Sequence, residues 1–528
     1  MKLLVLILLC AVAPSRAEPQ MPGFGKDTAA AVFGTAFTVL AERYIEPVSL
    51  SDMSLWGLRG LSALDPALRP ELSDGNLRLI TQGRTIAARL LPQADDPAGW
   101  GEATAWIADS AWTLSSPVRR AGSAGVIRAI FAELFTHLDS YSRYAGPEAA
   151  AAARERRAGT GGIGVQTVRR AGAIRVEEVI AEGPAAAAGL RRGDRILAVN
   201  GRRTAGHSAA EVERWIEGPE DTRVVLRVAP PRGAARDIAL TRTLVPPETV
   251  FVERTGTMLV VRITGFSSFT DRRLAHVLGD AVNTHEPPRG IVLDLRGNRG
   301  GLLRQAVEAA DLFLSDGIIG RTEGRHPASN REWRATGPDL LGGMPLVILV
   351  DGASASSAEI LSATLADRGR AVIVGSATLG KGLVQSIAPL PNDGELLVSW
   401  SRVIAPAGWP IQGLGVLPQV CTSRGSDDLA LQLTALTHGS ARMALAVAKH
   451  RAARAPLPAA VIADLRAPCP SAEPRESDLA AARYLIDNPA AYQTALLADA
   501  DPRSAPPPVA QPPLDSQRRA AMVPRLPE

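Results

Sequence analysis

A glycine-rich stretch near residue 380 contains a lysine that could do chemistry. Residues 375–382 read GSATLGKG, close to the G-x-x-x-x-G-K pattern of a phosphate-binding loop. That loop also needs a Ser or Thr hydroxyl after the lysine and a helix that begins there. Gly382 follows Lys381 instead, and the next residues, LVQSIAPLPNDGELLVSWSRV, read as strand, turn and strand. Nucleotide binding is therefore the weaker interpretation of this stretch.

Lysine is rare in this chain, which favours a different role for Lys381. The other lysines are Lys2, Lys26 and Lys449, and every remaining side chain of the Lys/Arg class is arginine. Arginine supplies positive charge but keeps its proton at working pH, whereas burial lowers the pKa of a lysine. A lysine kept in an apolar, glycine-flanked loop is a candidate general base. Chance retention of one lysine is the alternative.

A lysine base needs a nucleophile, and a serine-rich turn lies upstream of it. In VDGASASSAEILSATLADRG a strand ends, a tight Ala/Ser/Gly turn follows and a helix begins. Such a turn can expose a serine, with amides of the helix N-terminus facing a developing oxyanion. The candidates are Ser354, Ser356 and Ser357. They could also cap the helix, with Glu359 completing a capping box, and the two roles are compatible.

The patterns around this turn predict an α/β domain over residues 246–422. Strand-like runs such as GIVLDLRG, PLVILVDG and RAVIVG alternate with helical segments such as DRRLAHVLGDAVNTH and LLRQAVEAADLFL. Because the strand runs are apolar throughout, we expect a sheet covered on both faces.

The rest of the chain divides by composition into further regions. Residues 25–150 carry apolar residues at helical spacing, and residues 161–245 read as a small β-rich module with one or two helices. Helical patterns return over residues 425–500. Residues 501–528 are Pro-rich, which predicts a disordered tail.

The first residues resemble a secretory signal peptide. An early lysine precedes an apolar run of about a dozen residues, and Ser15-Arg16-Ala17 offers a small-x-small cleavage site after residue 17. We therefore expect an exported, periplasmic protein. An uncleaved anchor in the inner membrane, with the chain facing the periplasm, is the alternative, although the run is short for a membrane span.

Cysteine content and charge limit the classes of partner and cofactor. Cys421 and Cys469 remain after signal cleavage and could form a disulfide in an exported chain, the alternative being two free thiols. No His or Cys lies beside them at zinc-ligand spacing, which argues against a zinc site there. The net charge of +4 is spread without a basic run, which argues against a nucleic-acid partner.

Several ordered motifs resemble those of the carboxy-terminal processing peptidases, the tail-specific Ser/Lys endopeptidases of bacteria and chloroplasts. The similarity covers roughly residues 125–420 and includes these segments: LDSYSRY, GGIGV, GPAAAAGLRRGDRILAVNG, GIVLDLRGNRGGLLRQAVEAADLFL, GASASSAEI, GKGLVQ and WPIQGLGVLPQV. In combination the motifs are specific, although each alone is weak. The resemblance implies a crotonase/Clp-protease-like α/β catalytic core, an inserted β-rich PDZ domain at 161–245 and a helical N-terminal region.

The resemblance also implies a set of catalytic residues. In that family the nucleophilic serine stands three residues before a glutamate and 25 before the lysine, which selects Ser356, since 381 − 356 = 25. Gln385 matches the family's third residue, a glutamine four after the lysine. The oxyanion donors implied are the amide of Ser357 and that of Gly300 or Gly301.

The same resemblance implies a function. A Ser/Lys endopeptidase would use no cofactor and would capture apolar C-termini of protein or peptide substrates through the PDZ loop. That loop is formed by Gly161, Gly162, Ile163, Gly164 and Val165. A homodimer or an adaptor is a further candidate partner. The alternative function is a catalytically silent or latent PDZ-bearing scaffold. Asp294 and Arg296 are expected to be a structural pair that shapes the oxyanion loop.

Overall fold

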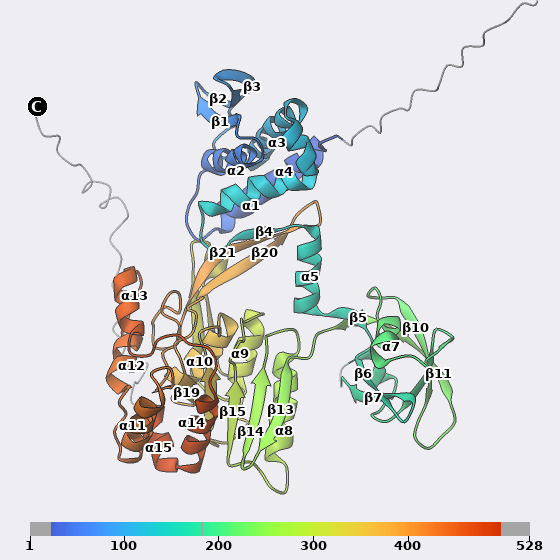
Figure 1. Ribbon diagram of the computed structural model, residues 1–528, viewed down its shortest axis with the longest axis vertical. Coiled ribbons are helices and arrows are strands. Elements are labelled where there is room, and N and C mark those ends of the chain that lie inside the picture. The colour runs from blue at the N-terminus through green and yellow to red at the C-terminus, as the bar shows by residue number, and fades with distance from the viewer. Residues whose placement is uncertain (1–22, 181–182, 498–528) are drawn as a thin grey trace, which may run out of the picture. The chain divides into compact units, whose positions relative to one another are not determined.

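The computed structural model describes residues 23–180 and 183–497, which form two compact units (Figure 1). The first unit contains the chain up to Glu148 together with Ile387–Val398, and the second contains the remainder. The signal-peptide prediction at 1–17 and the predicted disordered tail at 501–528 lie outside the described residues. Within those residues, no helix has both the length and the apolar character required to cross a membrane.

The first unit is mainly helical, as expected, but it also contains a small sheet. Four helices supply most of its core: α1 (Lys26–Arg43), α2 (Leu50–Leu64), α3 (Pro97–Leu114) and α4 (Ser116–Thr136). An antiparallel meander of β1 (Leu68–Ser73), β2 (Asn76–Thr81) and β3 (Arg84–Leu90) lies within the stretch predicted to be helical.

Two glycine-containing turns explain this meander. Asp74 and Gly75 have φ of 50° and 71°, and Gln82 and Gly83 have φ of 48° and 76°. Two successive residues with positive φ make the tight turn that suits the twist of a hairpin. Elsewhere in this unit, β4 (Arg143–Ala145) pairs with Glu395–Leu397 of β21.

Residues 160–245 of the second unit form a β-rich module. Its antiparallel sheet has the order β11-β10-β8-β7-β6, so β6 is an edge strand. The short β5 (Thr160–Gly162) and β12 (Thr243–Val245) pair where the chain enters and leaves the module. The remaining elements are α5 (Pro147–Ala158), which precedes the module, β6 (Val165–Arg170), β7 (Ala173–Val179), α6 (Pro184–Ala187), β8 (Arg195–Val199), β9 (Arg202–Arg203), α7 (Ala209–Ile216), β10 (Arg223–Ala229) and β11 (Arg236–Thr241).

A six-stranded sheet forms the centre of the α/β domain. Its order is β13-β14-β15-β18-β19-β22, and all neighbours are parallel except the β13–β14 hairpin. The strands are β13 (Val250–Thr255), β14 (Met258–Ile263), β15 (Gly290–Asp294), β18 (Leu346–Val350), β19 (Val372–Gly375) and β22 (Val420–Cys421).

Both faces of this sheet are covered, which confirms the expectation from its apolar strands. On one face, Ile291, Leu293 and Ile348 pack against α8 (Thr270–Val282), α9 (Leu303–Asp311) and α10 (Ser357–Asp367). On the other, Val292 and Val347 pack against α11 (Ser426–Thr437), α14 (Glu476–Asp487) and α15 (Pro489–Leu496). The helices predicted after residue 425 thus supply the second covering layer (Figure 1).

A second sheet and several short elements complete the described chain. Its order is β17-β16-β21-β20, and the tip of its β20–β21 hairpin belongs to the first unit. Its strands are β16 (Ile318–Glu323), β17 (Arg331–Arg334), β20 (Leu383–Pro389) and β21 (Glu395–Ile404). The remaining helices are the 3₁₀ turn η1 (Pro327–Ser329), α12 (Ala444–Arg451) and α13 (Ala459–Arg466).

Buried His450 at the end of α12 should make stability depend on pH. Its ring lies 4.8 Å from that of Trp409, and burial lowers the pKa of His450 from 6.5 to about 4. Because the folded-state pKa is depressed, the unfolded chain binds the extra proton. The stabilisation is therefore complete above pH 6.5 and is lost as the pH falls through 4.

We expect His450 to account for about 3 kcal/mol of lost stability between pH 7 and pH 4. Urea unfolding of the wild type and of His450→Gln at a series of pH values measures this contribution. The difference in unfolding free energy between the two proteins should shrink as the pH falls. Parallel pH curves would contradict the assignment.

Candidate active site

The candidate nucleophile lies on a sharp turn between β18 and α10. Ser356 has φ +57° and ψ −117°, a conformation that costs a non-glycine residue about 1–3 kcal/mol. Strain of this kind is typical of a strand-to-helix turn that presents a nucleophile. Ser356 is half-buried, whereas Ala355 and Ser357 on either side are buried. The turn therefore brings Ser356 closer to solvent than its two neighbours.

The hydroxyls of Ser354 and Ser357 are engaged in hydrogen bonds within the fold. Ser354 Oγ accepts the Asp351 N–H at 3.0 Å and donates to the Leu295 carbonyl at 2.8 Å. Ser357 Oγ donates to the Gly301 carbonyl at 3.1 Å. These structural bonds favour the serine between them as the nucleophile.

The side chain of Glu359 connects the serine turn to the lysine loop. Its Oε2 accepts the N–H of Ser356 at 2.7 Å and that of Lys381 at 2.9 Å. Its Oε1 accepts the N–H of Gly380 at 2.6 Å and the hydroxyl of Thr378. The backbones of Ser356 and Lys381 therefore meet on one carboxylate oxygen.

Glu359 is completely buried, and its partners act on its ionisation. Burial raises the pKa of Glu359, and the bonds from Thr378 and from three backbone amides oppose that rise. Thr378 Oγ1 already accepts the Val416 N–H at 2.8 Å, so its proton points toward Glu359. All four partners thus donate, and an ionised carboxylate can accept from all of them. The arrangement suits a buried anion neutralised by hydrogen bonds rather than by an ion pair.

Lys381 lies in a loop where close backbone packing requires glycine. The Lys381 Nζ lies 3.4 Å from Gln385 Oε1 on β20, so the two residues predicted together are neighbours. A Cβ on Gly382 would come within 2.2 Å of the Gln412 amide nitrogen. Gly380 has φ +88°. Together with the strand that follows, these contacts explain the Gly-Lys-Gly pattern without a phosphate.

The loop of the predicted oxyanion donors packs against the serine turn. A Cβ on Gly300 would come within 2.7 Å of the Ser356 Cβ and 3.0 Å of the Ser357 amide nitrogen. Only a glycine can bring its backbone so close to the candidate nucleophile.

The two glycines of that loop differ in what their amides do. The Gly300 N–H donates to Asn298 Oδ1 at 2.8 Å, so it is engaged within its own loop. The bridge to Phe266 uses the Gly300 carbonyl and the Leu302 N–H. In the described part of the chain, the Gly301 N–H has no hydrogen-bond acceptor. Of the two glycines, Gly301 is therefore the better placed donor.

Asp294 and Arg296 form a bidentate pair at the start of this loop. Arg296 Nε and Nη2 donate to the Asp294 carboxylate at 2.8 and 2.7 Å, and Nη1 donates to Asp478 at 3.1 Å. The hydrogen bonds to Asp294 are the largest influence, and they raise the pKa of Arg296. A guanidinium held on two carboxylates has a structural role, in agreement with the expected shaping of the loop.

The predicted peptide-binding loop leads into the open edge of the β-rich module. Gly161 and Gly162 belong to β5, and the Ile163 carbonyl accepts the Ala185 N–H at 2.9 Å. Gly164, with φ +77°, then turns the chain into the edge strand β6.

Helix α7 packs along that edge, where one of its side chains occupies a strand donor. Glu213 Oε1 accepts the Thr167 N–H of β6 at 2.7 Å and the Thr167 hydroxyl at 3.1 Å. A strand added to β6 would need this same backbone N–H. Glu213 therefore competes with any peptide that extends the sheet at this position.

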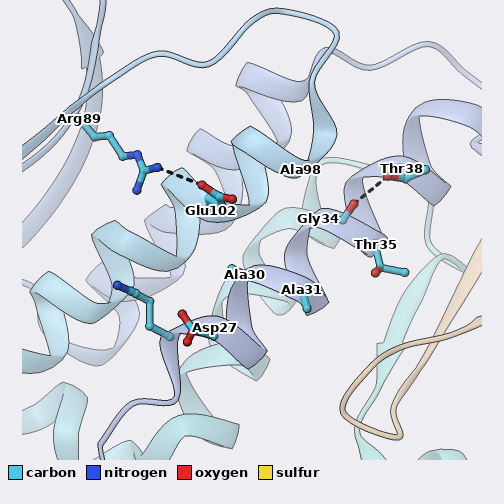
Figure 2. Close-up of a pocket in the computed structure, with 10 residues that line it drawn as sticks. Asp27, Ala30, Ala31, Gly34, Thr35, Thr38, Arg89, Ala98 and Glu102 are labelled. Carbon is cyan, nitrogen blue, oxygen red and sulfur yellow. Dashed lines mark hydrogen bonds and ion pairs between the residues drawn. The ribbon is translucent and has the colours of Figure 1, made fainter.

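The first unit contains a separate hollow of about 690 Å³ beside α1, α3 and β3 (Figure 2). Ala30, Gly34 and Ala98 line part of it, and Arg89 pairs with Glu102 at 3.2 Å. Lys26 and Thr38 also line the hollow, and the Thr38 hydroxyl donates to the Gly34 carbonyl of its own helix at 2.9 Å. Over the described residues, no group of three or more His, Cys, Asp or Glu has the arrangement of a metal site.

Three supporting residues were not predicted as parts of the site. From the sequence, Glu359 was interpreted only as a helix cap and as the residue that stands three positions after the nucleophile. Its place at the start of an apolar helix, beside two glycine-rich loops, could have indicated that its carboxylate is buried. Thr378 carries no local signal, because its partners Glu359 and Val416 lie 19 and 38 residues away in the sequence. Asn298 has one local partner, the Gly300 N–H two residues on, and one distant partner, the Ile263 carbonyl.

Two protein-family models match this chain. Residues 257–422 match peptidase family S41, and residues 175–230 match the PDZ domain. The α/β domain with the candidate site and the β-rich module therefore each correspond to a known family.

Curated relatives agree with these two matches. The "Carboxy-terminal-processing protease" of Bartonella bacilliformis is 33% identical over 54% of this chain and 66% of its own length. The "Carboxy-terminal processing protease CtpA" of Bacillus subtilis is 31% identical over 53% of this chain and 60% of its own. The matches thus leave a third or more of each relative uncovered. A solved photosystem II D1 C-terminal processing protease is 26% identical, covering 69% of this chain and 92% of that one, with a TM-score of 0.34.

Replacement of Glu359 by Gln should destabilise the protein by about 2–4 kcal/mol, because an amide NH₂ would face buried donors. Chemical denaturation measures this loss. Glu332→Gln is the control, since Glu332 forms an exposed pair with Arg334 and should change stability by less than about 0.5 kcal/mol. Equal stability of the two variants would show that the Glu359 carboxylate is not required.

Proposed function

We propose that this chain, in which residues 257–422 match peptidase family S41 and residues 175–230 match the PDZ domain, is an exported serine endopeptidase that captures substrate C-termini. The observation that carries the proposal is the meeting of the strained Ser356 turn and the Lys381 loop on Glu359. This arrangement holds the backbones of two distant segments together, which supports the pairing of Ser356 with Lys381.

The proposed reaction proceeds through an acyl-enzyme. Neutral Lys381 takes the proton of Ser356 Oγ as that oxygen attacks the peptide carbonyl. Gln385, 3.4 Å from the lysine Nζ, holds the amine in position. The resulting oxyanion is stabilised by the amides of Ser357 and Gly301. Lys381 then protonates the leaving amine, and water hydrolyses the ester.

Substrate capture is assigned to the PDZ domain. The loop from Gly161 to Val165 offers backbone amides to a C-terminal carboxylate, and the last residues of the substrate add a strand to β6. Apolar C-termini are the substrate class that this mode favours. Displacement of Glu213 from Thr167 is the step that opens the edge of β6.

Two observations bear on where the protein works. Cys421 and Cys469 form a disulfide, and disulfides persist in oxidising compartments such as the periplasm. The signal-like first 17 residues agree with export.

A non-catalytic PDZ scaffold is the second candidate function. A scaffold would have no use for a nucleophile turn held in a costly backbone conformation, nor for a buried carboxylate that joins this turn to a lysine loop. These features favour the peptidase.

Ser356→Ala and Lys381→Arg should both abolish cleavage of an unfolded protein with an apolar C-terminus. The first variant removes the nucleophile, and the second keeps the charge but cannot act as a base. We expect kcat to fall by at least about 10³-fold in each, without loss of folding. Gel-based digestion and circular dichroism measure the two properties. Full activity of Lys381→Arg would refute the base assignment.

Glu213→Ala should strengthen binding of a peptide with an apolar C-terminus by about three- to tenfold, because it frees the Thr167 N–H. Fluorescence anisotropy with a labelled peptide measures the affinity. Asp237→Ala is the control, since Asp237 lies on β11 at the opposite edge of the sheet and pairs with Arg227. Unchanged or weaker binding by Glu213→Ala alone would contradict competition at the strand edge.

A further inference from the structure

The segment between α13 and α14 contacts the loops of the candidate site. We define the C-terminal strap as Arg466–Asp478, which lies beyond the S41 match at 257–422. Ser471 Oγ in the strap donates to the Ala377 carbonyl at 2.7 Å. Ser376 Oγ exchanges hydrogen bonds with the backbone of Ala472, at 3.0 Å from its N–H and 3.1 Å to its carbonyl. The strap thus holds the chain that leads into the lysine loop.

Arg466, at the start of the strap, makes two short hydrogen bonds to the loops around the site. Its Nη2 donates to the Thr378 carbonyl at 2.6 Å, and its Nη1 donates to the Leu414 carbonyl at 2.5 Å. Burial lowers the pKa of the Arg466 guanidinium, and the nearby Glu359 carboxylate opposes that change. Thr378 is the residue whose hydroxyl binds Glu359. Arg466 therefore fixes the backbone of a residue that Glu359 uses to position the lysine loop.

The strap also reaches the other two loops of the site. The Gly352 N–H, in the turn that leads to the candidate serine, donates to the Ala472 carbonyl at 2.8 Å. At the start of the oxyanion loop, Arg296 donates to Asp478 Oδ2 at 3.1 Å and to the Arg475 carbonyl at 3.1 Å. One segment thus hydrogen-bonds to the nucleophile turn, the lysine loop and the oxyanion loop.

The disulfide fixes the strap to the catalytic sheet. Cys469 of the strap is bonded to Cys421 of β22, and both residues are completely buried. Cys421 in turn pairs with Gly375 at the end of β19, immediately before the lysine loop. The anchor therefore lies next to the element that the strap positions.

We propose that the C-terminal strap is a positioning element of the active site and that the Cys421–Cys469 bond holds it in place. This inference rests on the proposed peptidase function. Its consequence is that full activity requires the disulfide, so the enzyme works best where that bond forms. The strap residues act through the loops, and none of them is assigned to the chemistry.

The first test compares Arg466→Ala with Arg454→Ala. Arg466 donates to three carbonyls, those of Thr378, Leu414 and Gly413. Arg454 is a matched control, because it also donates to three carbonyls, those of Arg451, Ala453 and Ala407, but to none in the loops of the candidate site. We expect Arg466→Ala to lower kcat by about tenfold or more, because small displacements of reacting groups are costly, while KM stays within about twofold. Arg454→Ala should keep the wild-type kcat.

The second test removes the anchor with the double variant Cys421→Ala/Cys469→Ala. We expect a fall in kcat of similar size, and slower covalent labelling of Ser356 by a fluorophosphonate, at temperatures below the thermal midpoint of the variant. Binding of a C-terminal peptide to the PDZ domain should be unchanged, which separates a positioning role from general unfolding.

The outcomes distinguish this inference from the proposed function. If wild-type protein neither cleaves substrate nor reacts with the fluorophosphonate, the peptidase function itself fails. If the wild type is active and Arg466→Ala and the double cysteine variant keep its kcat, the role of the strap is refuted. Should either variant fail to fold, Ser471→Ala removes one strap bond to Ala377 with little change in volume. A wild-type kcat in that folded variant would equally overturn the proposal.

Discussion

The Glu359 carboxylate accepts hydrogen bonds from the serine turn and from the lysine loop, and both halves of the site depend on it. Burying a carboxylate costs several kcal/mol unless donors surround it, and here Thr378 and three backbone amides do so. Loss of any one donor would leave part of the buried carboxylate without a hydrogen bond and would reduce the stabilisation that the other donors provide. This carboxylate thus adds to the direct link between the two segments, in which the Leu379 N–H donates to the Ser354 carbonyl at 3.0 Å.

The α/β sheet explains why those segments can meet. Parallel strands bring their carboxyl ends to one edge, so the turn after β18 and the loop after β19 start side by side. The sheet is covered on one face by α8, α9 and α10 and on the other by α11, α14 and α15. The C-terminal helices are therefore part of the core of the α/β domain, and the strap between α13 and α14 contacts the loops of the candidate site.

The PDZ domain shows how a binding edge can be kept from indiscriminate pairing. An open edge strand exposes backbone donors and acceptors that invite any extended chain. On β6, one of these donors is the Thr167 N–H, and the Glu213 carboxylate of α7 accepts a hydrogen bond from it. A peptide that pairs with β6 must replace this internal hydrogen bond. Only a peptide whose own contacts are stronger than the bond to Glu213 will displace it. In the function that we propose, such competition would add to direct contacts in the selection of substrates.

Local patterns in the sequence predicted the α/β domain, and the resemblance of its motifs to a known family selected Ser356 and Lys381 as the proposed serine–lysine pair. Apolar runs reveal buried strands locally, and the position of Glu359 three residues after Ser356 is a property of one helix start. Even the glycines around Lys381 could be recognised as unsuited to a phosphate loop, because the residue after the lysine and the following strand pattern are local features.

Tertiary structure decided what depends on distant partners. The Glu359 carboxylate accepts the Lys381 N–H from 22 residues away, and Arg466 donates to the Thr378 carbonyl across 88 residues. The strands at 68–90 lie within a stretch that was predicted to be helical. Paired strands are specified by their turns and by neighbouring strands rather than by one repeat spacing of apolar residues. A hydrogen bond needs both partners at about 3 Å, and no local pattern tells which residues the fold will bring that close.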